Sequence, residues 1–415
     1  MNEIKQKVLI PEYMQKFHCI GSDCEDTCCF GWGVQIDKTT YKKYMNDKKT
    51  DLRQDFLQKV VKNTTGLSDY DYARIKLCSD GTCPFLDESK LCRIQLKHGE
   101  EYLSTVCTTY PRMSQIIDGV LEKSATLSCP EAARLCLLNP DGVDFVEIEE
   151  DLRTRNIIGR SINTNNSDFN NSPEKYFWDL RFFSIQLIKC RDYEMWERLL
   201  ILGLFYNELQ EKVDKNRVGE IPALVESYQD MATSGVFNGI LNEFESQTAI
   251  QLRLLKEMTS KDIFNIKTQK RFMVCLDEFS QGIHSDQTAN DEEILDYYKE
   301  AYNNYYKPFM DKKGYMLENY LVNIMFKNLF PFSGKNGLFE NYLIIALHYS
   351  IIKMILIGMS GYYKQDFNEK HVIKLIQSFG KVLEHDRYFF KLAFDALEKS
   401  GFKELSHIAI LIKDL

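Results

Sequence analysis

The cysteines are the residues of this sequence whose type and spacing point most directly to chemistry. Ten of the twelve lie between Cys19 and Cys136, and the first four form the run Cys19-x4-Cys24-x3-Cys28-Cys29. Thiolates bind zinc in fours or hold iron in sulfur clusters, so eight well-spaced cysteines exceed what one structural zinc needs. The sequence therefore predicts a metal centre, and its candidate ligands are Cys19, Cys24, Cys28, Cys29, Cys83, Cys92, Cys107 and Cys129.

The cysteine pattern leaves the kind of metal open. Cys83 and Cys129 are each followed by proline, as ligands in ferredoxin-type sequences often are, which favours an iron–sulfur cluster with zinc as the alternative. Cys28 and Cys29 are adjacent, and adjacent side chains diverge, so we expect one to bind metal and the other to have a second role. The isolated cysteines are predicted to be buried as small hydrophobic residues: Cys78, Cys136, Cys190 and Cys275.

The composition of the 415 residues is that of a globular protein, with 44% hydrophobic and 27% charged residues. Met1 to Met14 lacks the continuous apolar core of a signal peptide, which predicts a cytoplasmic protein whose thiols are kept reduced. The net charge of −8 argues against a nucleic acid partner, because phosphate binding needs clustered Lys and Arg. A cationic partner is compatible with this charge.

Two parts of the chain differ in pattern, and the polar stretch 161–172 (SINTNNSDFNNS) separates them. The predicted division is a metal-binding domain at 1–160, a linker at 161–172 and a helical domain at 173–415. Five of the nine prolines fall in the first part, which indicates short helices and loops. The predicted fold class is mainly α: a Cys-rich, loop-rich N-terminal lobe followed by an irregular α-helical domain.

Apolar residues recur at three- and four-residue spacing through most of the second part. After the N-cap signal Ser172-Pro173, helices are predicted over Tyr176 to Leu187, Met195 to Val213, Thr248 to Met258, Glu292 to Tyr306, Tyr315 to Phe330, Phe339 to Met359 and Glu369 to Leu383. The most apolar stretch, Tyr342 to Met359, is interrupted by His348, Ser350 and Lys353 and is short against the ~20 apolar residues of a membrane span. It is predicted to be a buried core helix rather than a transmembrane segment; attachment to a membrane surface stays open.

Several motifs make the sequence similar to known families. The elements Phe-x-Cys, Cys-x3-Cys-Cys, Cys-Pro-Phe-Leu, Cys-x-Ile and Cys-x2-Tyr-Pro-Arg resemble the YkgJ-type zinc- or iron-chelating module. The stretch GSDCEDTCCFGWGVQID, together with the later ENYLVNIMFKNLFPF, is similar to the FliB family of flagellin lysine-N-methylases. The similarity spans most of the chain, and the second stretch distinguishes a methylase from the chelating module alone.

This resemblance implies an enzyme that methylates lysine ε-amino groups of flagellin with S-adenosylmethionine and carries a [4Fe–4S] cluster. The eight cysteines named above are its candidate ligands, and which four of them bind one cluster stays open. Arg112 is a candidate for binding the cofactor carboxylate, and Tyr110 and Trp32 are candidates for lining its site through their flat faces. Structural roles remain the alternative for all three residues. Glu25 and Asp26 are predicted to lie in a solvated loop, and His348 and His385 to be structural histidines.

Two familiar cofactor motifs are missing from the sequence. No strand is followed by a Gly-rich turn and a helix, which is the usual cradle of a methyltransferase cofactor. The Cys-x3-Cys-x2-Cys loop of radical enzymes is incomplete, because its third position is Gly31. The sequence therefore names no catalytic base and does not choose between polar and radical transfer.

Three functions are compatible with this sequence. A protein-lysine N-methyltransferase is the leading hypothesis, because the resemblance accounts for both parts of the chain. The alternatives are a zinc- or iron–sulfur-binding redox or structural module on a helical protein-binding scaffold, and a peptide-binding adaptor whose cluster is purely structural.

Overall fold

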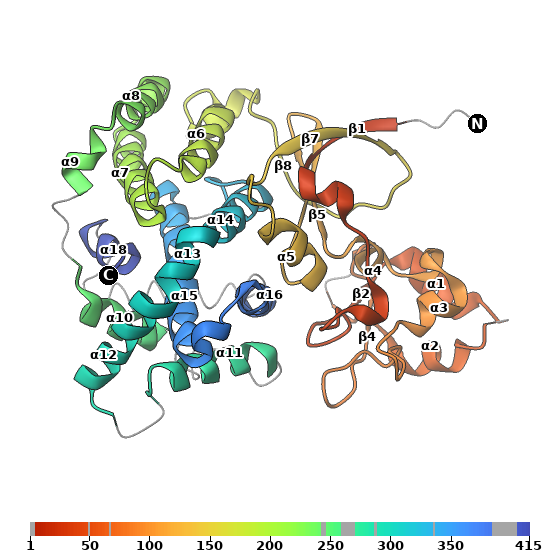
Figure 1. Cartoon of the computed structure of the whole chain (residues 1–415). Coiled ribbons are helices and arrows are strands. Elements are labelled where there is room, and N and C mark those ends of the chain that lie inside the picture. Colours follow the sequence, from red (N-terminus) through yellow and green to blue (C-terminus); the bar gives the residue numbers. More distant parts are fainter. Residues whose placement is uncertain are drawn as a thin grey trace.

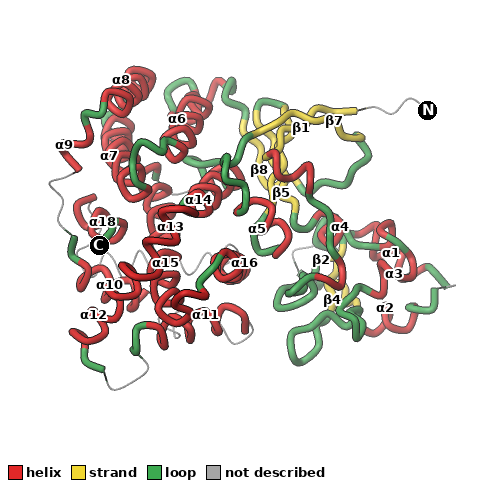
Figure 2. The backbone as a smooth tube through the Cα atoms, viewed as in Figure 1, coloured by secondary structure: helices red, strands yellow, loops and turns green. Residues whose placement is uncertain are grey.

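The computed structural model describes residues 5–48, 50–65, 68–241, 246–258, 270–285, 289–334, 337–383 and 405–415. Helices make up most of this part of the chain, so the predicted mainly α fold class is confirmed (Figure 2). The long helices gather on one side of the molecule, and a small sheet lies next to them (Figure 1). Short helices and loops that carry most of the cysteines lie on the other side.

The helical part follows the periodicity of the sequence closely. Its helices are α6 (Phe177–Lys189), α7 (Met195–Asp214), α8 (Ile221–Ser234), α9 (Phe237–Leu241), α10 (Thr248–Met258), α11 (Lys270–Gly282), α12 (Asp291–Ala301), α13 (Lys307–Lys313), α14 (Tyr315–Lys327), α15 (Leu338–Tyr363), α16 (Glu369–Leu383) and α18 (Leu405–Ile412). The predicted helix to Tyr306 instead ends as a π-helix, Tyr302–Tyr306. The predicted helices are thus confirmed to within a few residues at each end.

Helix α15 is the central helix of this part, as its continuous apolar sequence predicted. By length and composition it could cross a membrane, but 94% of its most apolar window is buried inside the protein. The buried Lys353 ammonium donates to the Ile412 and Lys413 carbonyls and to Asp414, at 2.7 to 2.9 Å. His348, predicted to be a structural histidine, is also buried, and its Nδ1 lies 2.7 Å from the Tyr320 hydroxyl. His385, for which the same prediction was made, lies outside the described residues.

A five-stranded sheet covers one end of the helical part. Its strand order is β7-β1-β6-β5-β8, and β1 runs parallel to β6 and antiparallel to β7. Asp118 and Gly119 have positive φ values of 50° and 83° and join β5 to β6, as this residue pair favours in tight hairpins. The strands are β1 (Lys5–Pro11), β5 (Arg112–Ile117), β6 (Val120–Ala125), β7 (Phe145–Asp151) and β8 (Ile158–Ile162).

The cysteine-bearing segment, residues 17–110, is called the Cys lobe below. Its buried apolar residues form a core of their own, which includes Ile36, Tyr44, Phe56 and Phe85. Around this core lie β2 (Gln35–Ile36), β3 (Val60–Lys62), β4 (Ala73–Ile75), α1 (Lys38–Asn46), α2 (Arg53–Lys59), α3 (Arg93–His98) and α4 (Thr105–Thr109). Helix α5 (Pro130–Leu137) packs against the helical core instead.

The segment predicted as a linker, 161–172, begins in β8 and continues into the short 3-10 helix Ser167–Phe169. Asp118, in the turn between β5 and β6, accepts hydrogen bonds from the Thr164 backbone amide at 2.7 Å and from the Trp178 indole of α6 at 2.8 Å. These hydrogen bonds connect the segment and α6 to the sheet. The predicted division into domains at this segment stays a prediction.

A buried ion pair joins the sheet to the helices. Both terminal nitrogens of Arg181 on α6 lie 2.9 Å from the carboxylate of Glu122 on β6, and the two side chains are only 4% and 1% exposed. Arg181 also donates to the Phe326 carbonyl at the end of α14, at 3.2 Å. Because a buried charge without a partner is strongly unfavourable, this pair requires α6, α14 and β6 to stay together.

Replacing Glu122 with Ala should lower the free energy of unfolding by about 3 kcal/mol, because it leaves the Arg181 guanidinium buried without its counter-ion. The measurement is urea unfolding followed by circular dichroism. Lys7→Ala is the matched control: its pair with Glu147 also involves a strand of this sheet but is exposed, so we expect no measurable change. Equal stability of both variants and the parent would contradict a structural role for the pair.

Candidate functional site

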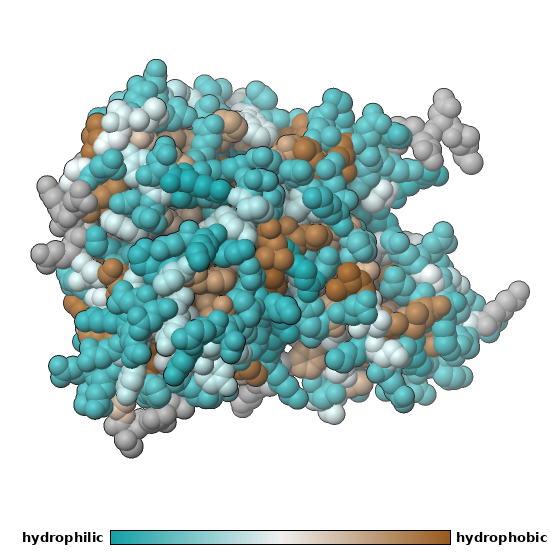
Figure 3. All heavy atoms as spheres, viewed as in Figure 1, coloured by the Kyte–Doolittle hydropathy of each residue, from teal (hydrophilic) through white to brown (hydrophobic). Residues whose placement is uncertain are grey.

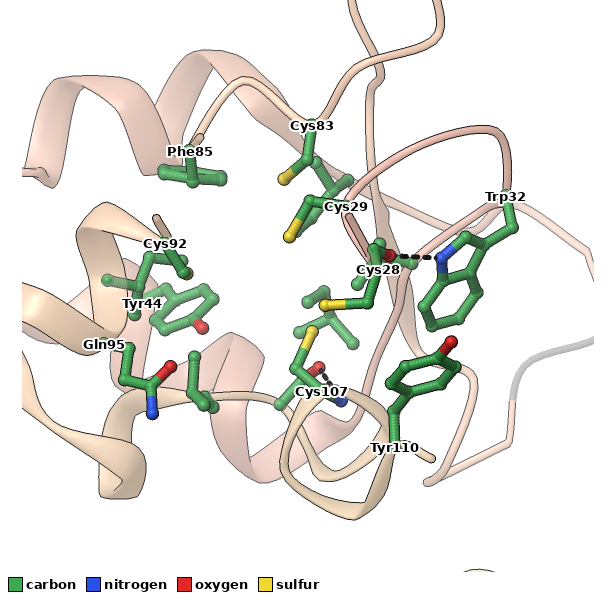
Figure 4. A pocket seen from close by; sticks show the side chains of 16 residues that line it. Cys28, Cys29, Trp32, Tyr44, Cys83, Phe85, Cys92, Gln95, Cys107 and Tyr110 are labelled. Carbon is green, nitrogen blue, oxygen red and sulfur yellow. Dashed lines mark hydrogen bonds between the residues drawn. The ribbon is translucent and has the colours of Figure 1, made fainter. Parts of the chain in front are cut away.

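Five of the eight predicted ligands line one cavity in the Cys lobe. The cavity has a volume of about 60 Å³, and its walls are otherwise mostly apolar, with Ile36, Phe85 and Leu103 among them. Figure 4 shows the sulfur atoms of four cysteines pointing toward the same space. The five cysteines are Cys28, Cys29, Cys83, Cys92 and Cys107.

Short-range backbone contacts bring these cysteines together from distant positions. The loop of Cys28 and Cys29 is held against the loop of Cys83, because the Cys83 amide donates to the Cys29 carbonyl at 2.9 Å. Gly31 and Gly81 have positive φ values of 82° and 87°, which glycine adopts without strain, and the Gly31 amide donates to the Gly81 carbonyl at 3.0 Å.

The two remaining cysteines of the cavity come from helix starts. Cys92 is the residue before α3, and its strand-like bridge to Leu86 ties it to the loop that follows Cys83. Cys107 lies in the first turns of α4, where the Ser104 hydroxyl accepts a hydrogen bond from its amide. Cys83, Cys92 and Cys107 are therefore far apart in the sequence because one loop and two short helices each place one cysteine at the same cavity.

The thiols of the cavity differ in acidity because they interact with one another. A hydrogen bond from Cys29 lowers the pKa of Cys28 to about 7, against the opposing effect of burial, and the Lys381 ammonium also favours the thiolate. Cys29 likewise lowers the pKa of Cys83, and its own pKa is strongly raised as the shared donor. Burial raises the pKa of Cys107 to about 12. The Cys29 thiol therefore favours the thiolate forms of both Cys28 and Cys83.

The other three predicted ligands, Cys19, Cys24 and Cys129, do not line the cavity. Burial raises the pKa of Cys24 and that of Cys129, the latter to about 12, and Cys24 acts electrostatically on Cys129. In the described part of the chain, no three His, Cys, Asp or Glu side chains form a group that could hold a metal ion as they stand. The cavity gathers the five thiols without closing them to metal-ligand distance.

Of the three predicted cofactor residues, two line the cavity and one does not. Trp32 and Tyr110 lie side by side at its edge, with ring centroids 6.2 Å apart, and the Trp32 indole donates to the Cys28 carbonyl at 2.6 Å (Figure 4). Arg112 is outside the cavity at the start of β5, and its guanidinium lies 5.1 Å from the centre of the Phe17 ring. The structure therefore separates Arg112 from the aromatic pair.

The loop before Cys28 is bound to the helical part by ion pairs and hydrogen bonds. The prediction of a solvated loop is confirmed for Glu25, which is exposed, but was wrong for Asp26, which is partly buried. The Asp26 carboxylate accepts from Lys381 at 2.9 Å and from Gln377 at 2.8 Å, both on α16. Glu25 pairs with Arg134 on α5 at 2.8 Å. The loop has these partners because α5 and α16 present basic and amide side chains toward the Cys lobe, which no local sequence pattern reveals.

The isolated cysteines are mostly covered, as predicted. Cys136 and Cys275 are buried and Cys190 is partly covered, but Cys78 is exposed, so the prediction of burial was wrong for that residue. Cys78 lies in a tight turn, where its carbonyl accepts from the Gly81 amide at 3.0 Å, and the turn points its residues to solvent.

The structure has two larger cavities outside the Cys lobe that the sequence did not predict. One, of about 470 Å³, is lined by charged and tyrosine side chains, and the buried Glu318 at its base accepts from Arg198 at 2.8 Å and from Arg191 at 2.9 Å. Glu318 belongs to the element ENYLVNIMFKNLFPF, so a buried acid in an apolar helix was the available signal. The other cavity, of about 780 Å³, lies between the sheet and α6.

The surface offers few further clues. Figure 3 shows one face of the molecule as predominantly hydrophilic, with a group of hydrophobic side chains around α5, where the helical part meets the Cys lobe.

Comparisons with known proteins identify the family of this chain. The FliB lysine N-methylase C-terminal domain matches residues 181–411, more than half of the chain, so the chain belongs to that family. It is 26% identical over 386 residues, 91% of both chains, to the lysine-N-methylase of Salmonella typhimurium and likewise to that of Salmonella choleraesuis. A flagellar biosynthetic protein FliU of Salmonella muenchen is 38% identical over 141 residues, 33% of this chain and 80% of that protein. No solved structure matches the chain.

The predicted enzyme class, a protein-lysine N-methyltransferase, is confirmed by this membership and by the full-length relatives. The family match begins after the Cys lobe, so the similarity of the lobe to the YkgJ-type chelating module stays a prediction.

The acidity pattern of the cavity predicts an order of thiol reactivity. In metal-free protein, alkylation of Cys28 by iodoacetamide should speed up as the pH rises through about 7 and level off above it, because the thiolate is the reactive form. Cys107 should stay unmodified over the same range, since its pKa is about 12. Peptide mass spectrometry after short pulses at pH 6 to 9 measures both sites. Equal rates at Cys28 and Cys107 would contradict the described arrangement.

Proposed function

We propose that this protein transfers methyl groups from S-adenosylmethionine to lysine ε-amino groups of flagellin, and that its Cys lobe holds an iron–sulfur cluster. The observation that carries the proposal is the meeting of five thiols in one cavity of a chain that belongs to the FliB lysine N-methylase family. Flagellin as the substrate is supported by the name of the FliU relative and by the resemblance of the sequence. We place the enzyme in the cytoplasm, where such thiols stay reduced.

The residues of the cavity suit a thiolate-bound metal centre. A cluster takes four thiolate ligands, and the cavity offers Cys28, Cys29, Cys83, Cys92 and Cys107 between mostly apolar walls. When bound, an iron–sulfur cluster supplies one electron or an iron atom with an open position, whereas zinc on the same residues would be structural.

Methyl transfer requires a neutral amine. A lysine ammonium with an ordinary pKa of about 10.4 has no lone pair, so the site must desolvate it or remove a proton before the new carbon–nitrogen bond forms. In a polar transfer the carbon–sulfur bond of the donor breaks as this bond forms, and its electron pair stays on sulfur in S-adenosylhomocysteine. The net charge of −8 favours approach of cationic lysines.

Anaerobically purified protein should be brown and contain iron bound to sulfide. Cys83→Ser should lose most of this iron, because Cys83 is buried on the cavity wall, whereas Cys190→Ser should keep it, because Cys190 lies outside the cavity. Iron and zinc content by mass spectrometry and the visible spectrum decide the result. Colourless protein with stoichiometric zinc, or equal iron in both variants, would contradict the cluster assignment.

Incubating the protein without oxygen with flagellin and methyl-labelled S-adenosylmethionine should place label on flagellin lysines. The label is located by peptide mass spectrometry, and Cys190→Ser serves as the variant control. Cluster-replete protein that leaves flagellin unlabelled would overturn the substrate assignment. Labelling by metal-free Cys83→Ser protein would show that the metal is not needed for transfer.

A further inference from the structure

The loop that carries Cys28 and Cys29, two of the cysteines that line the cavity of the Cys lobe, has no regular structure of its own. Residues 24–29 contain bends but neither a helix nor a strand. A metal site needs its ligands held to within about 0.5 Å, and side chains on a loop meet this demand only when neighbouring groups fix them. Groups outside the loop must therefore hold it at the cavity.

Helix α16 of the helical part provides such a group in Lys381. Its ammonium donates to the two carboxylate oxygens of Asp26 at 3.0 and 2.9 Å and to the Thr27 carbonyl at 2.9 Å. All three donors of the ammonium are thus used on two consecutive residues of the loop. The side chains of Lys381 and Asp26 are only 11% and 18% exposed, so water screens this ion pair less than it screens a surface pair.

Further hydrogen bonds connect this contact to the cysteine pair. The Asp26 carboxylate also accepts from the Thr27 amide at 2.7 Å, and the Thr27 hydroxyl accepts from the Cys29 amide at 3.1 Å. Directly after the pair, the centre of the Phe30 ring lies 5.7 Å from the Lys381 ammonium. One side chain of α16 therefore contacts the loop on both sides of its two cysteines.

A second residue of α16 strengthens this contact, and the helix itself is firmly held. The amide of Gln377, which is fully buried, donates to the Asp26 carboxylate and to the Ser128 carbonyl, both at 2.8 Å. The loop is therefore bound to a helix whose apolar side is part of the helical core. The fully buried residues on that side include Val372, Leu375, Ile376 and Phe379.

We propose that Lys381 is a positioning residue of the metal centre, which holds the loop of Cys28 and Cys29 at the cavity from the helical part of the chain. This inference rests on the proposed function, because the loop is positioned for a metal. Residues that orient the ligands of a metal from outside typically cost about 10- to 100-fold in metal affinity when they are removed. The Cys lobe and the FliB C-terminal domain, which includes α16, then build one site together.

The test is a titration of the metal-free full chain with cobalt(II) without oxygen, followed by the charge-transfer absorption of thiolate-bound cobalt. Lys381→Met should weaken cobalt binding by about tenfold or more. Lys381→Arg should stay within about threefold of the parent, because a guanidinium keeps the charge and donates to carboxylates. Lys370→Met is the matched control, since Lys370 is exposed on the same helix, and Cys83→Ser should lose the absorption. Circular dichroism confirms that each variant is folded.

Two further measurements keep the test independent of the folding of one variant. Asp26→Asn removes the counter-ion of Lys381 from the loop side, keeps the size of the side chain and leaves α16 intact; it should weaken cobalt binding by about threefold or more. Hydrogen exchange of the metal-free protein reports on the loop directly. The amides of residues 24–31 should exchange faster in Lys381→Met than in the parent, and Lys381→Arg should restore their protection.

The outcomes separate this proposal from the proposed function. Cobalt binding that depends on Cys83 but is unchanged in folded Lys381→Met would overturn the proposal, while the metal assignment of the cavity stands. Parent-like binding by Asp26→Asn would overturn it even if Lys381→Met did not fold. Equal weakening by Lys381→Met and Lys381→Arg, or unchanged exchange of residues 24–31, would also contradict a positioning role. A parent protein that binds no cobalt through Cys83 would overturn both proposals.

Discussion

The buried pair of Arg181 and Glu122 is the interaction on which the arrangement of this protein depends. Neither charge can stay inside the protein without the other, so the sheet that carries Glu122 must dock on the helix that carries Arg181. This docking also fixes the end of α14 through the Phe326 carbonyl and closes the cavity in front of α6.

A second constraint acts in the Cys lobe, where five thiols share a small apolar cavity. Thiolates repel one another, and in this lobe the Cys29 thiol favours the thiolates of Cys28 and Cys83. The Lys381 ammonium of α16 also lowers the pKa of Cys28. A cation in the cavity would remove this conflict. The salt bridge of Lys381 with Asp26 then connects the state of the cavity to the helical part, because α16 packs against α5 and the central helix.

The sequence predicted the long helices well because their apolar residues recur at the helical period, as in α7 and α16. It did not predict the five-stranded sheet, since β6 buries Glu122, Lys123 and Ser124 and so lacks the alternation of a half-buried strand. Spacing singled out eight cysteines as candidate ligands, five of which line the cavity, but it did not predict the separation of Cys19, Cys24 and Cys129. Their role as metal ligands stays a prediction. The cavity near Arg181 depends on residues far apart in the chain, from Leu9 to Phe326, and no local pattern reveals it.

The central claim is the proposal that a methylase of this family holds iron on four of the five thiols that line the cavity of the Cys lobe. The most direct measurement is an anomalous-scattering map at the iron edge from crystals grown without oxygen. The account predicts one strong iron peak inside the cavity bounded by Cys28, Cys29, Cys83, Cys92 and Cys107. An iron peak elsewhere, or a cavity that holds zinc or no metal in crystals of active protein, would contradict it.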